Sequence, residues 1–181
     1  MRHLKSALFL SALALSACAS EPLRTSPLSP HALRALAAVH VDPTAAAAML
    51  TAYRHTKGLG PVRLDPALTA MAQRQADAMV AANALSHDVA GNFASRLAAA
   101  GIDTPRAGEN VGGGYYSTEE AMKGWRESSE HNANLLMPQA TRFGIAIAKD
   151  ARTSLRVYWA VEVAAEAEKP AGAVAAAGRL Q

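Results

Sequence analysis

Two short runs of alternating apolar residues near the end of the chain constrain the fold most. Phe143, Ile145 and Ile147 alternate with smaller or polar residues, and the same alternation recurs over residues 155–163. A period of two places every second side chain on one face, as in a β-strand. Residues 149–154 lie between the runs, so the sequence predicts an antiparallel hairpin that closes the domain.

Helical periodicity fills most of the chain before this hairpin. Asp42-Pro43 and Asp65-Pro66 each pair a good N-cap with a proline at the first helical position. Ser117 and Glu120 form a capping box, and Gly101 ends a shorter helix. The predicted helices cover about residues 43–57, 65–85, 92–100 and 117–128, with a further helical turn over 132–137.

An extended stretch over residues 104–111 separates the third and fourth predicted helices. Together with the hairpin it gives a three-stranded antiparallel sheet, whose apolar faces need helices on both sides. The sequence therefore predicts an α+β domain over residues 43–164. A domain of this size buries enough surface to be stable without disulfides or metals.

The first 17 residues have the features of a secretory signal peptide. Arg2 and Lys5 precede an apolar run that ends at residue 15 and is too short to span a bilayer. The Leu-Ser-Ala-Cys motif ending at Cys18 resembles the bacterial lipobox, in which the cysteine is lipid-modified and becomes the new N-terminus. Cys18 is the only cysteine of the chain, so it has no partner for an internal disulfide. The alternative is an ordinary signal peptide with an incidental cysteine.

A lipid on Cys18 implies an extracytoplasmic protein whose partner is a membrane. The residue after Cys18 is Ala19 and not Asp. This resembles the rule that sorts lipoproteins to the outer membrane in cells with two membranes. Residues 18–42 contain several prolines and serines and are typical of a linker, although Ser29-Pro30 can start a short helix. Residues 165–181 are rich in alanine and predict a disordered tail.

The charge of the mature chain excludes one class of partner. Without Arg2 and Lys5, the 18 basic residues fall to 16, against 15 acidic residues. The basic residues form no clustered stripe, so nothing indicates a surface for nucleic acid.

Two histidines and a carboxylate form the only group of residues with clear chemical potential. Glu109 and Asn110 lie in a glycine-rich stretch that we interpret as a turn, and His87 and His131 lie equally far on either side of Glu109. Two imidazoles and a carboxylate can bind Zn²⁺ and leave a fourth position for water. Alternatively, Glu109 accepts backbone hydrogen bonds across its loop and the histidines pack near helix ends. The sequence contains no motif for a nucleophile or a phosphate loop.

Five short motifs occur in a characteristic order between about residues 44 and 164. They are Leu64-Asp65 to Leu68, Leu85-Ser86-His87, Gly108-Glu109-Asn110-Val111, Trp125 to His131 with Asn134-Leu135-Leu136, and Phe143-Gly144-Ile145-Ala146 before Tyr158-Trp159. In this order they resemble the CAP superfamily of cysteine-rich secretory proteins, antigen 5 and pathogenesis-related 1 proteins, and most closely its bacterial lipoprotein-type members. The resemblance implies a three-layer α-β-α sandwich with a small antiparallel sheet and a central cleft.

In that family two histidines and two acidic residues line the cleft and can hold a divalent metal. The resemblance places His87, Glu109 and His131 in three of these positions. Ser128 stands where the family commonly has its second glutamate. We therefore expect at most weak Zn²⁺ binding, lost below about pH 6 as the imidazoles are protonated.

These features favour a binding module, in which a lipid-anchored domain takes a lipid, peptide or cell-wall ligand in its cleft. The expected cleft residues are His87, Glu109, Asn110 and His131. Two alternatives stay open. One is a metal-dependent hydrolase of a cell-envelope substrate, with a metal-bound water near Glu109. The other is an envelope protein in which these residues only fix the loops.

Overall fold

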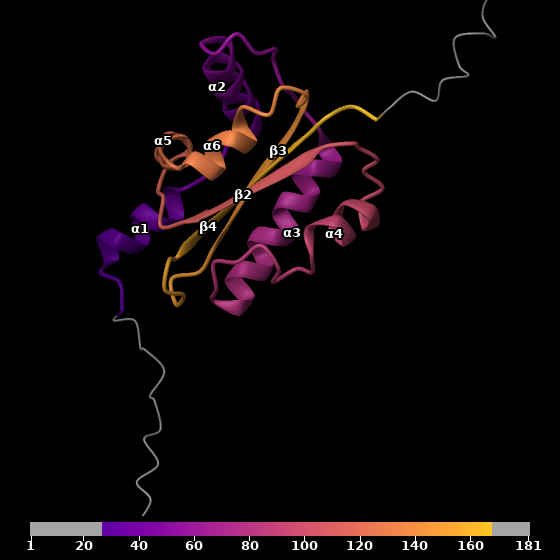
Figure 1. Cartoon of the computed structure of the whole chain (residues 1–181). Helices are drawn as coiled ribbons and strands as arrows, with labels where there is room; N and C mark the ends of the chain where they lie inside the picture. The colour runs from indigo at the N-terminus through magenta and orange to yellow at the C-terminus, as the bar shows by residue number, and fades with distance from the viewer. Residues whose placement is uncertain (1–26, 168–181) are drawn as a thin grey trace, which may run out of the picture.

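The architecture is that of a computed structural model, which describes residues 27–167. Helices pack on both sides of a four-stranded sheet (Figure 1). The predicted signal peptide, Cys18 and residues 168–181 lie outside the described residues. In chain order the elements are α1 (Pro30–Ala38), α2 (Pro43–His55), β1 (Arg63–Leu64), α3 (Pro66–Ala82), α4 (Phe93–Ala99), β2 (Ala107–Gly113), α5 (Thr118–Glu127), α6 (Ser129–Leu135), β3 (Arg142–Lys149) and β4 (Val157–Ala164).

The sheet has the strand order β1-β3-β4-β2, with the predicted hairpin of β3 and β4 at its centre. β2 pairs antiparallel with the other side of β4. These three strands and the α+β class are as predicted. The sheet also has a fourth strand, β1, which is two residues long and runs parallel to β3. Leu64 lies in this strand, just before the start of α3.

Both faces of the sheet are covered, which gives the three layers expected. α3 packs along one face, against a cluster that includes Val111, Ala146 and Tyr158. On the other face, Trp125 and Trp159 are buried in a cluster with residues of α1, α2 and α6. Figure 1 shows α3 and α4 on one side of the strands and α2, α5 and α6 on the other. Every residue of β4 is buried, because the strand has a neighbour on each side and a helical layer on each face.

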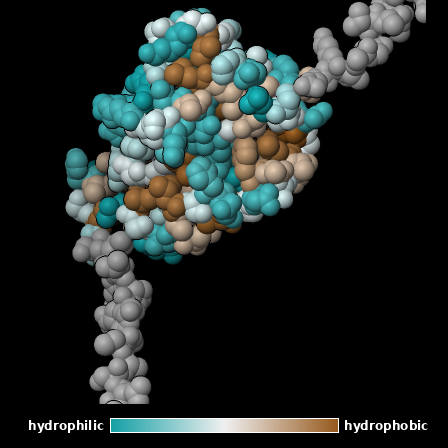
Figure 2. Space-filling view, viewed as in Figure 1, coloured by the Kyte–Doolittle hydropathy of each residue, from teal (hydrophilic) through white to brown (hydrophobic). Residues whose placement is uncertain are grey.

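The visible surface is largely polar. Figure 2 shows hydrophilic residues over most of this face, with smaller hydrophobic patches between them. Within residues 27–167, the large apolar side chains that stay exposed are Leu33, Leu85 and Tyr116. No single helix in this range is long and apolar enough to cross a membrane. α1 and α2 pass that test together by length and composition, but they meet at a bend of 72°.

Side-chain caps begin the main helices at the predicted residues. Asp42 and Asp65 each accept two backbone hydrogen bonds from the first turns of α2 and α3. Ser117 accepts from the backbone N–H of Glu120 at 3.2 Å, and the Glu120 carboxylate accepts from the backbone N–H of Tyr116. These caps satisfy N–H groups that the first turn of a helix leaves unpaired.

Two short helices differ from the sequence-based expectation in extent. α1 forms at the Ser29-Pro30 pair, the helix start that the sequence allowed within the segment expected to be a linker, and Leu36 of α1 and its C-cap Val39 join the core. α6 begins at Ser129, before the helical turn predicted from residue 132. Burial of an apolar face against α2 and the sheet explains why α1 is helical in a proline-rich segment.

α3 ends at Ala82, before the predicted end near residue 85. Asn83 has a left-handed conformation with a φ of 47°. Its side-chain oxygen accepts hydrogen bonds from the backbone N–H of Ser154 and from the hydroxyl of Tyr158, at 2.8 and 3.0 Å. These bonds to the hairpin hold Asn83 in the conformation that stops the helix. The residues between α3 and α4 are left as the loop that carries His87.

Arg54 ties α2 to the segment that follows α6. Its side chain is fully buried, and its guanidinium donates to the carbonyls of Leu135, Met137 and Ala140 at 2.8, 3.0 and 2.9 Å. The last carbonyls of a helix have no partners within the helix. Arg54 therefore closes the C-terminus of α6 and fixes it against α2.

The glycine-rich stretch is a strand, not the turn expected from its sequence. β2 continues through Gly112 and Gly113, and within this stretch only Gly114 has a positive φ, of 78°. A Cβ at Gly112 would lie 2.9 Å from the Tyr115 ring, and a Cβ at Gly113 would lie 2.5 Å from Leu155. The first two glycines thus allow close packing, and the predicted site residues before them lie in a regular strand.

Gly144→Ala should destabilise the fold strongly. A Cβ at Gly144 would clash with backbone atoms of Leu68 and Thr69 in α3, so the helix would have to move away from β3. We expect the free energy of unfolding, measured in urea, to fall by about 3 kcal/mol. Gly60→Ala is the control, because no atom lies within 4 Å of the carbon it adds. Equal losses in the two variants would contradict this explanation.

Candidate functional site

Glu109 and Glu162 lie side by side in the sheet. They are directly paired between β2 and β4, so their side chains leave the same face of the sheet. Glu109 is 6% exposed and Glu162 is 0% exposed. Two buried carboxyl groups this close resist ionisation unless a cation or a shared proton compensates them.

Arg96 of α4 supplies that cation. Its Nη1 and Nη2 atoms donate to the two carboxylate oxygens of Glu109 at 2.7 and 2.8 Å, and Nη1 lies 3.6 Å from Glu162 Oε1. Nε and Nη2 also donate to the backbone carbonyls of Gly91 and His87, both at 3.0 Å. Arg96 therefore connects α4, the loop after α3 and β2.

The surroundings shift the pKa values of the two carboxyl groups in opposite directions. Burial opposes ionisation of Glu109, but hydrogen bonds from Arg96, Glu162 and His87 and the charge of Arg96 outweigh it, so the pKa of Glu109 is lowered. Burial and the charge of Glu109 raise the pKa of Glu162 well above its usual range. Neither oxygen of Glu162 accepts a hydrogen bond from a nitrogen or hydroxyl group of the described residues. The surroundings of Glu162 therefore favour its protonated form, which could share its proton with ionised Glu109.

His87 is the exposed end of this network. Its side chain is 50% exposed, and its Nδ1 lies 2.7 Å from Glu109 Oε1. An ionised carboxylate only accepts hydrogen bonds, so in the neutral ring Nδ1 carries the proton and Nε2 keeps a lone pair. The loop itself is held by Gln75, whose side-chain amide donates to the carbonyl of Ser86 at 2.7 Å. A buried ion pair thus orients an imidazole that faces solvent.

His131 approaches β2 from the other face of the sheet. Alternate residues of a strand point to opposite faces, so Asn110 faces α6 whereas Glu109 faces α4. Asn110 is 1% exposed; its amide nitrogen donates to the carbonyl of His131 at 3.0 Å and its oxygen accepts from Asn134 at 2.9 Å. Burial, and then the charge of nearby His87, lower the pKa of His131.

The structure brings the predicted site residues to one edge of the sheet. β2 is an edge strand, with His87 and Glu109 in direct contact on one side and His131 on the other. We name the group of His87, Arg96, Glu109, His131 and Glu162 the edge site. Asn110 supports the helix that carries His131. The carboxylate of Glu109 bonds to side chains, and not to the backbone N–H groups considered as the alternative from the sequence.

The edge site does not fit a metal ion bound by His87, Glu109 and His131. Between residues 27 and 167, no three His, Cys, Asp or Glu side chains form a group that could hold a metal. Both oxygens of Glu109 face the guanidinium of Arg96, and Oε1 also faces His87. A divalent cation would have to displace Arg96 from this carboxylate.

Sequence reasoning missed Arg96 and Glu162. In the alternating pattern of β4, Glu162 would face solvent if one face of the strand were exposed. The available signal was composition: every residue of β4 except Glu162 is apolar, which is typical of a strand buried on both faces. A carboxyl group inside such a strand needs a partner. Nothing in the local sequence marks Arg96.

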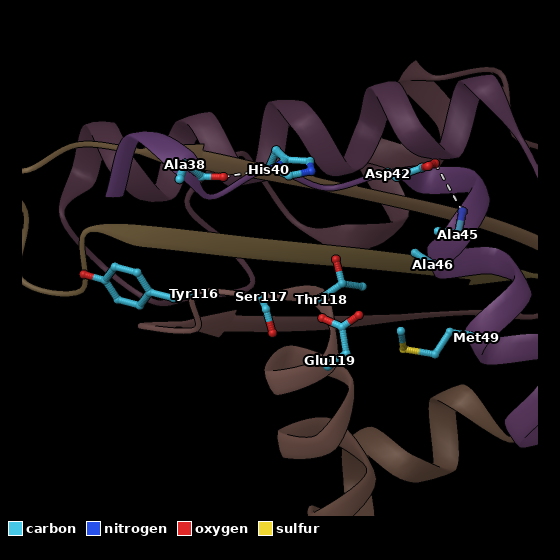
Figure 3. A pocket seen from close by; sticks show the side chains of 10 residues that line it. All are labelled: Ala38, His40, Asp42, Ala45, Ala46, Met49, Tyr116, Ser117, Thr118 and Glu119. Carbon is cyan, nitrogen blue, oxygen red and sulfur yellow. Dashed lines mark hydrogen bonds between the residues drawn. The ribbon is translucent and has the colours of Figure 1, made fainter. Parts of the chain in front are cut away.

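A separate pocket lies away from the edge site. It has a volume of about 300 Å³ and lies between the start of α2, the residues before it and the start of α5 (Figure 3). Its polar lining includes His40, Asp42 and Glu119, and Asp42 already caps α2. No residue of the edge site lines this pocket. We therefore place the candidate site at the edge of β2, where buried charges are organised around an exposed ring.

Glu162→Gln should change how stability depends on pH. Because the pKa of Glu162 is raised in the folded state, the folded protein keeps a proton that the unfolded chain releases above about pH 4.5. The stability of the wild type therefore falls as pH rises from there towards the folded pKa. Gln imitates the protonated acid, so the stability of the variant relative to the wild type should increase as pH rises above about 4.5 towards the folded pKa, by at most about 1.4 kcal/mol per pH unit.

Urea unfolding at several pH values measures this gain. Glu119→Gln is the control, because Glu119 is an exposed glutamate of α5 and its change should leave the pH profile as it is. Parallel profiles of Glu162→Gln and the wild type would mean that Glu162 is ionised in the native protein.

Comparisons with known proteins identify the family. Residues 47–163 match the CAP family model, which describes the cysteine-rich secretory protein family. The chain is 30% identical over 99 residues to the protein YkwD of Bacillus subtilis, a match that covers 54% of this chain and 38% of YkwD.

Two solved structures share the fold. One is an extracellular protein containing an SCP domain from Bacillus anthracis, with a TM-score of 0.62 and 20% identity, covering 78% of this chain and 45% of that one. The other is an outer surface protein from Borrelia burgdorferi, with a TM-score of 0.58 and 15% identity, covering 66% of this chain and 88% of that one. The chain spans less than half the length of YkwD and of the B. anthracis protein. The family match covers more than half of the chain and includes the whole edge site, so the chain belongs to the CAP family.

Proposed function

We propose that this protein is a lipid-anchored, extracytoplasmic CAP domain whose edge site binds a ligand of the cell envelope. One observation carries the proposal: a buried ion pair holds the half-exposed ring of His87 in a single orientation. Glu109 does not need that ring as a partner, because Arg96 alone donates to both of its oxygens. A solvent-facing imidazole oriented by a buried carboxylate is typical of groups that bind or react.

The protonation states in the edge site indicate the kind of ligand. Because the pKa of His131 is lowered, its ring is neutral at pH 7. When its ring is neutral, His87 offers Nε2 as an acceptor; Arg96 is neutralised by Glu109, and the raised pKa of Glu162 favours its uncharged form. The site thus offers hydrogen bonds with little net charge. This arrangement suits the polar groups of a peptide, a glycan or a lipid head group.

Two observations support a location outside the cytoplasm. The N-terminal sequence has the features of a secretory signal with a lipobox at Cys18. Two proteins of the same fold are described as extracellular and as an outer surface protein. The lipid anchor itself is proposed from the N-terminal sequence alone.

A hydrolytic role has less support than binding. Within the described residues, the ring of His87 bonds only to Glu109, and no Ser, Thr or Cys side chain bonds to its other nitrogen. Nucleophilic catalysis needs such a contact between the base and the nucleophile. A ring that is oriented but has no reactive partner fits ligand recognition better.

His87→Ala should weaken ligand binding and leave the fold nearly intact. Glu109 keeps both hydrogen bonds from Arg96 in this variant, so we expect the free energy of unfolding to change by less than about 1 kcal/mol. A thermal-shift screen of the wild type with muropeptides and phospholipid vesicles identifies the ligand, and calorimetry then compares affinities. We expect the variant to bind about tenfold more weakly, which corresponds to one well-made hydrogen bond.

His55→Ala is the matched control for this experiment. His55 is an exposed histidine in the last turn of α2, so its removal should alter neither stability nor affinity. A ligand affinity of His87→Ala equal to that of the wild type would contradict the proposed site. A wild type that binds none of these ligands would favour the alternative in which the edge site only fixes the loops.

Cys18→Ser should release the protein from the membrane. The variant lacks the thiol that would carry the lipid, and each buried methylene of a lipid chain contributes roughly 0.8 kcal/mol to membrane binding. We expect the variant in the soluble fraction and without radiolabelled palmitate. Ser20→Ala, two residues further on, should leave both properties as in the wild type. Labelling that persists in Cys18→Ser would refute the anchor.

A further inference from the structure

We propose that Arg96 is the resident cation of the edge site and a positioning residue for His87, so that the site works without a divalent metal. Arg96 has the place beside Glu109 that a metal ion would need. Glu109 acts as the hydrogen-bond partner of His87 and not as a metal ligand. The inference concerns the same site as the proposed function, but it holds or fails whatever the ligand is.

The contacts of Arg96 leave no room for a competing cation. All three nitrogen atoms of the guanidinium donate to acceptors, which are the two oxygens of Glu109 and the carbonyls of Gly91 and His87. The Arg96 side chain is only 6% exposed. A metal bound to Glu109 would leave this guanidinium buried and partly unpaired, or would lie against its positive charge.

The charges in the site balance without a metal. The guanidinium of Arg96 lies against both Glu109 and Glu162 and compensates the negative charge of Glu109, and the imidazoles of His87 and His131 add no charge in their neutral forms. Two imidazoles without a carboxylate make an incomplete ligand set for zinc. If the wild type binds zinc through His87 and His131, the affinity should therefore be low and should not depend on Glu109.

Arg96 also determines which nitrogen of His87 faces solvent. The guanidinium keeps Glu109 ionised and fixed, and it holds the backbone of His87 through its carbonyl. Glu109 then accepts the proton of Nδ1, so Nε2 is the nitrogen presented to a ligand. In this arrangement an arginine and a carboxylate together orient the imidazole that a metal would otherwise fix.

Calorimetric titration of the full chain with zinc chloride tests the first part. We expect the wild type and Glu109→Gln to bind zinc equally weakly, within about threefold. Tight, stoichiometric binding by the wild type that Glu109→Gln weakens by about tenfold or more would overturn the proposal, because Glu109 would then be a ligand.

Variants of Arg96 test whether its charge excludes the metal. Arg96→Met frees Glu109, Glu162 and His87, so zinc affinity should rise by about tenfold or more and zinc should raise the melting temperature. Arg96→Lys keeps the charge and should bind zinc as weakly as the wild type. Arg142→Met is the matched control, because it breaks another arginine–carboxylate pair, with Asp65, without touching the edge site. A folded Arg96→Met with unchanged zinc affinity would overturn the proposal.

Nitrogen-15 NMR of the His87 ring at about pH 8 tests the second part, and the spectrum of the wild type alone can already contradict it. The wild type should show the tautomer with the proton on Nδ1. Arg96→Met should show a mixture of the two tautomers, whereas Arg142→Met should keep the wild-type signal. If Arg96 only stabilised the fold, its replacement would not change the tautomer of His87. A wild-type ring with the proton on Nε2 would overturn the assignment of Arg96 and Glu109 as positioning residues.

Discussion

The ion pair between Arg96 and Glu109 is the interaction on which the edge site depends. It joins α4 to β2, and through the carbonyl of His87 it also holds the loop after α3. Without the guanidinium, Glu109 would be a buried carboxylate beside a second carboxyl group, and breaking a buried pair costs about 3–5 kcal/mol. The contact that stabilises this part of the fold is therefore the same contact that orients the exposed imidazole.

The central position of β4 explains why one of the two carboxyl groups keeps its proton. Strands cover both edges of β4 and helices cover both of its faces, so Glu162 has no access to water. Its other strand neighbour is Gly144, over which the backbone of α3 passes closely. Keeping a proton there costs less free energy than burying a second negative charge. The charge of the site thus follows from the strand order.

Most of the fold could be predicted from the sequence, because helix caps and strand periodicity depend on residues that are close together in the chain. Aspartate–proline pairs begin α2 and α3, and the period of two marks the hairpin of β3 and β4. β1 is too short for any periodicity and pairs with a strand much later in the chain. The contact of His87 with Glu109 was expected mainly from the family resemblance. Arg96 and Glu162 join it only through the packing of α4 and the order of the strands, which no local pattern encodes.

The bonds of Arg54 have a consequence for how fast a ligand can enter. They fasten the end of the helix that carries His131, so swinging α6 outwards would break several buried hydrogen bonds at roughly 1–3 kcal/mol each. The ring of His87, by contrast, is half exposed and held by one side-chain bond. Side-chain rotation in exposed residues takes picoseconds to nanoseconds, whereas movement of whole elements takes microseconds to milliseconds. A ligand should therefore reach the edge of β2 without waiting for a helix to move, at a rate determined by diffusion and orientation. Differences in affinity should then appear in the residence time of the ligand.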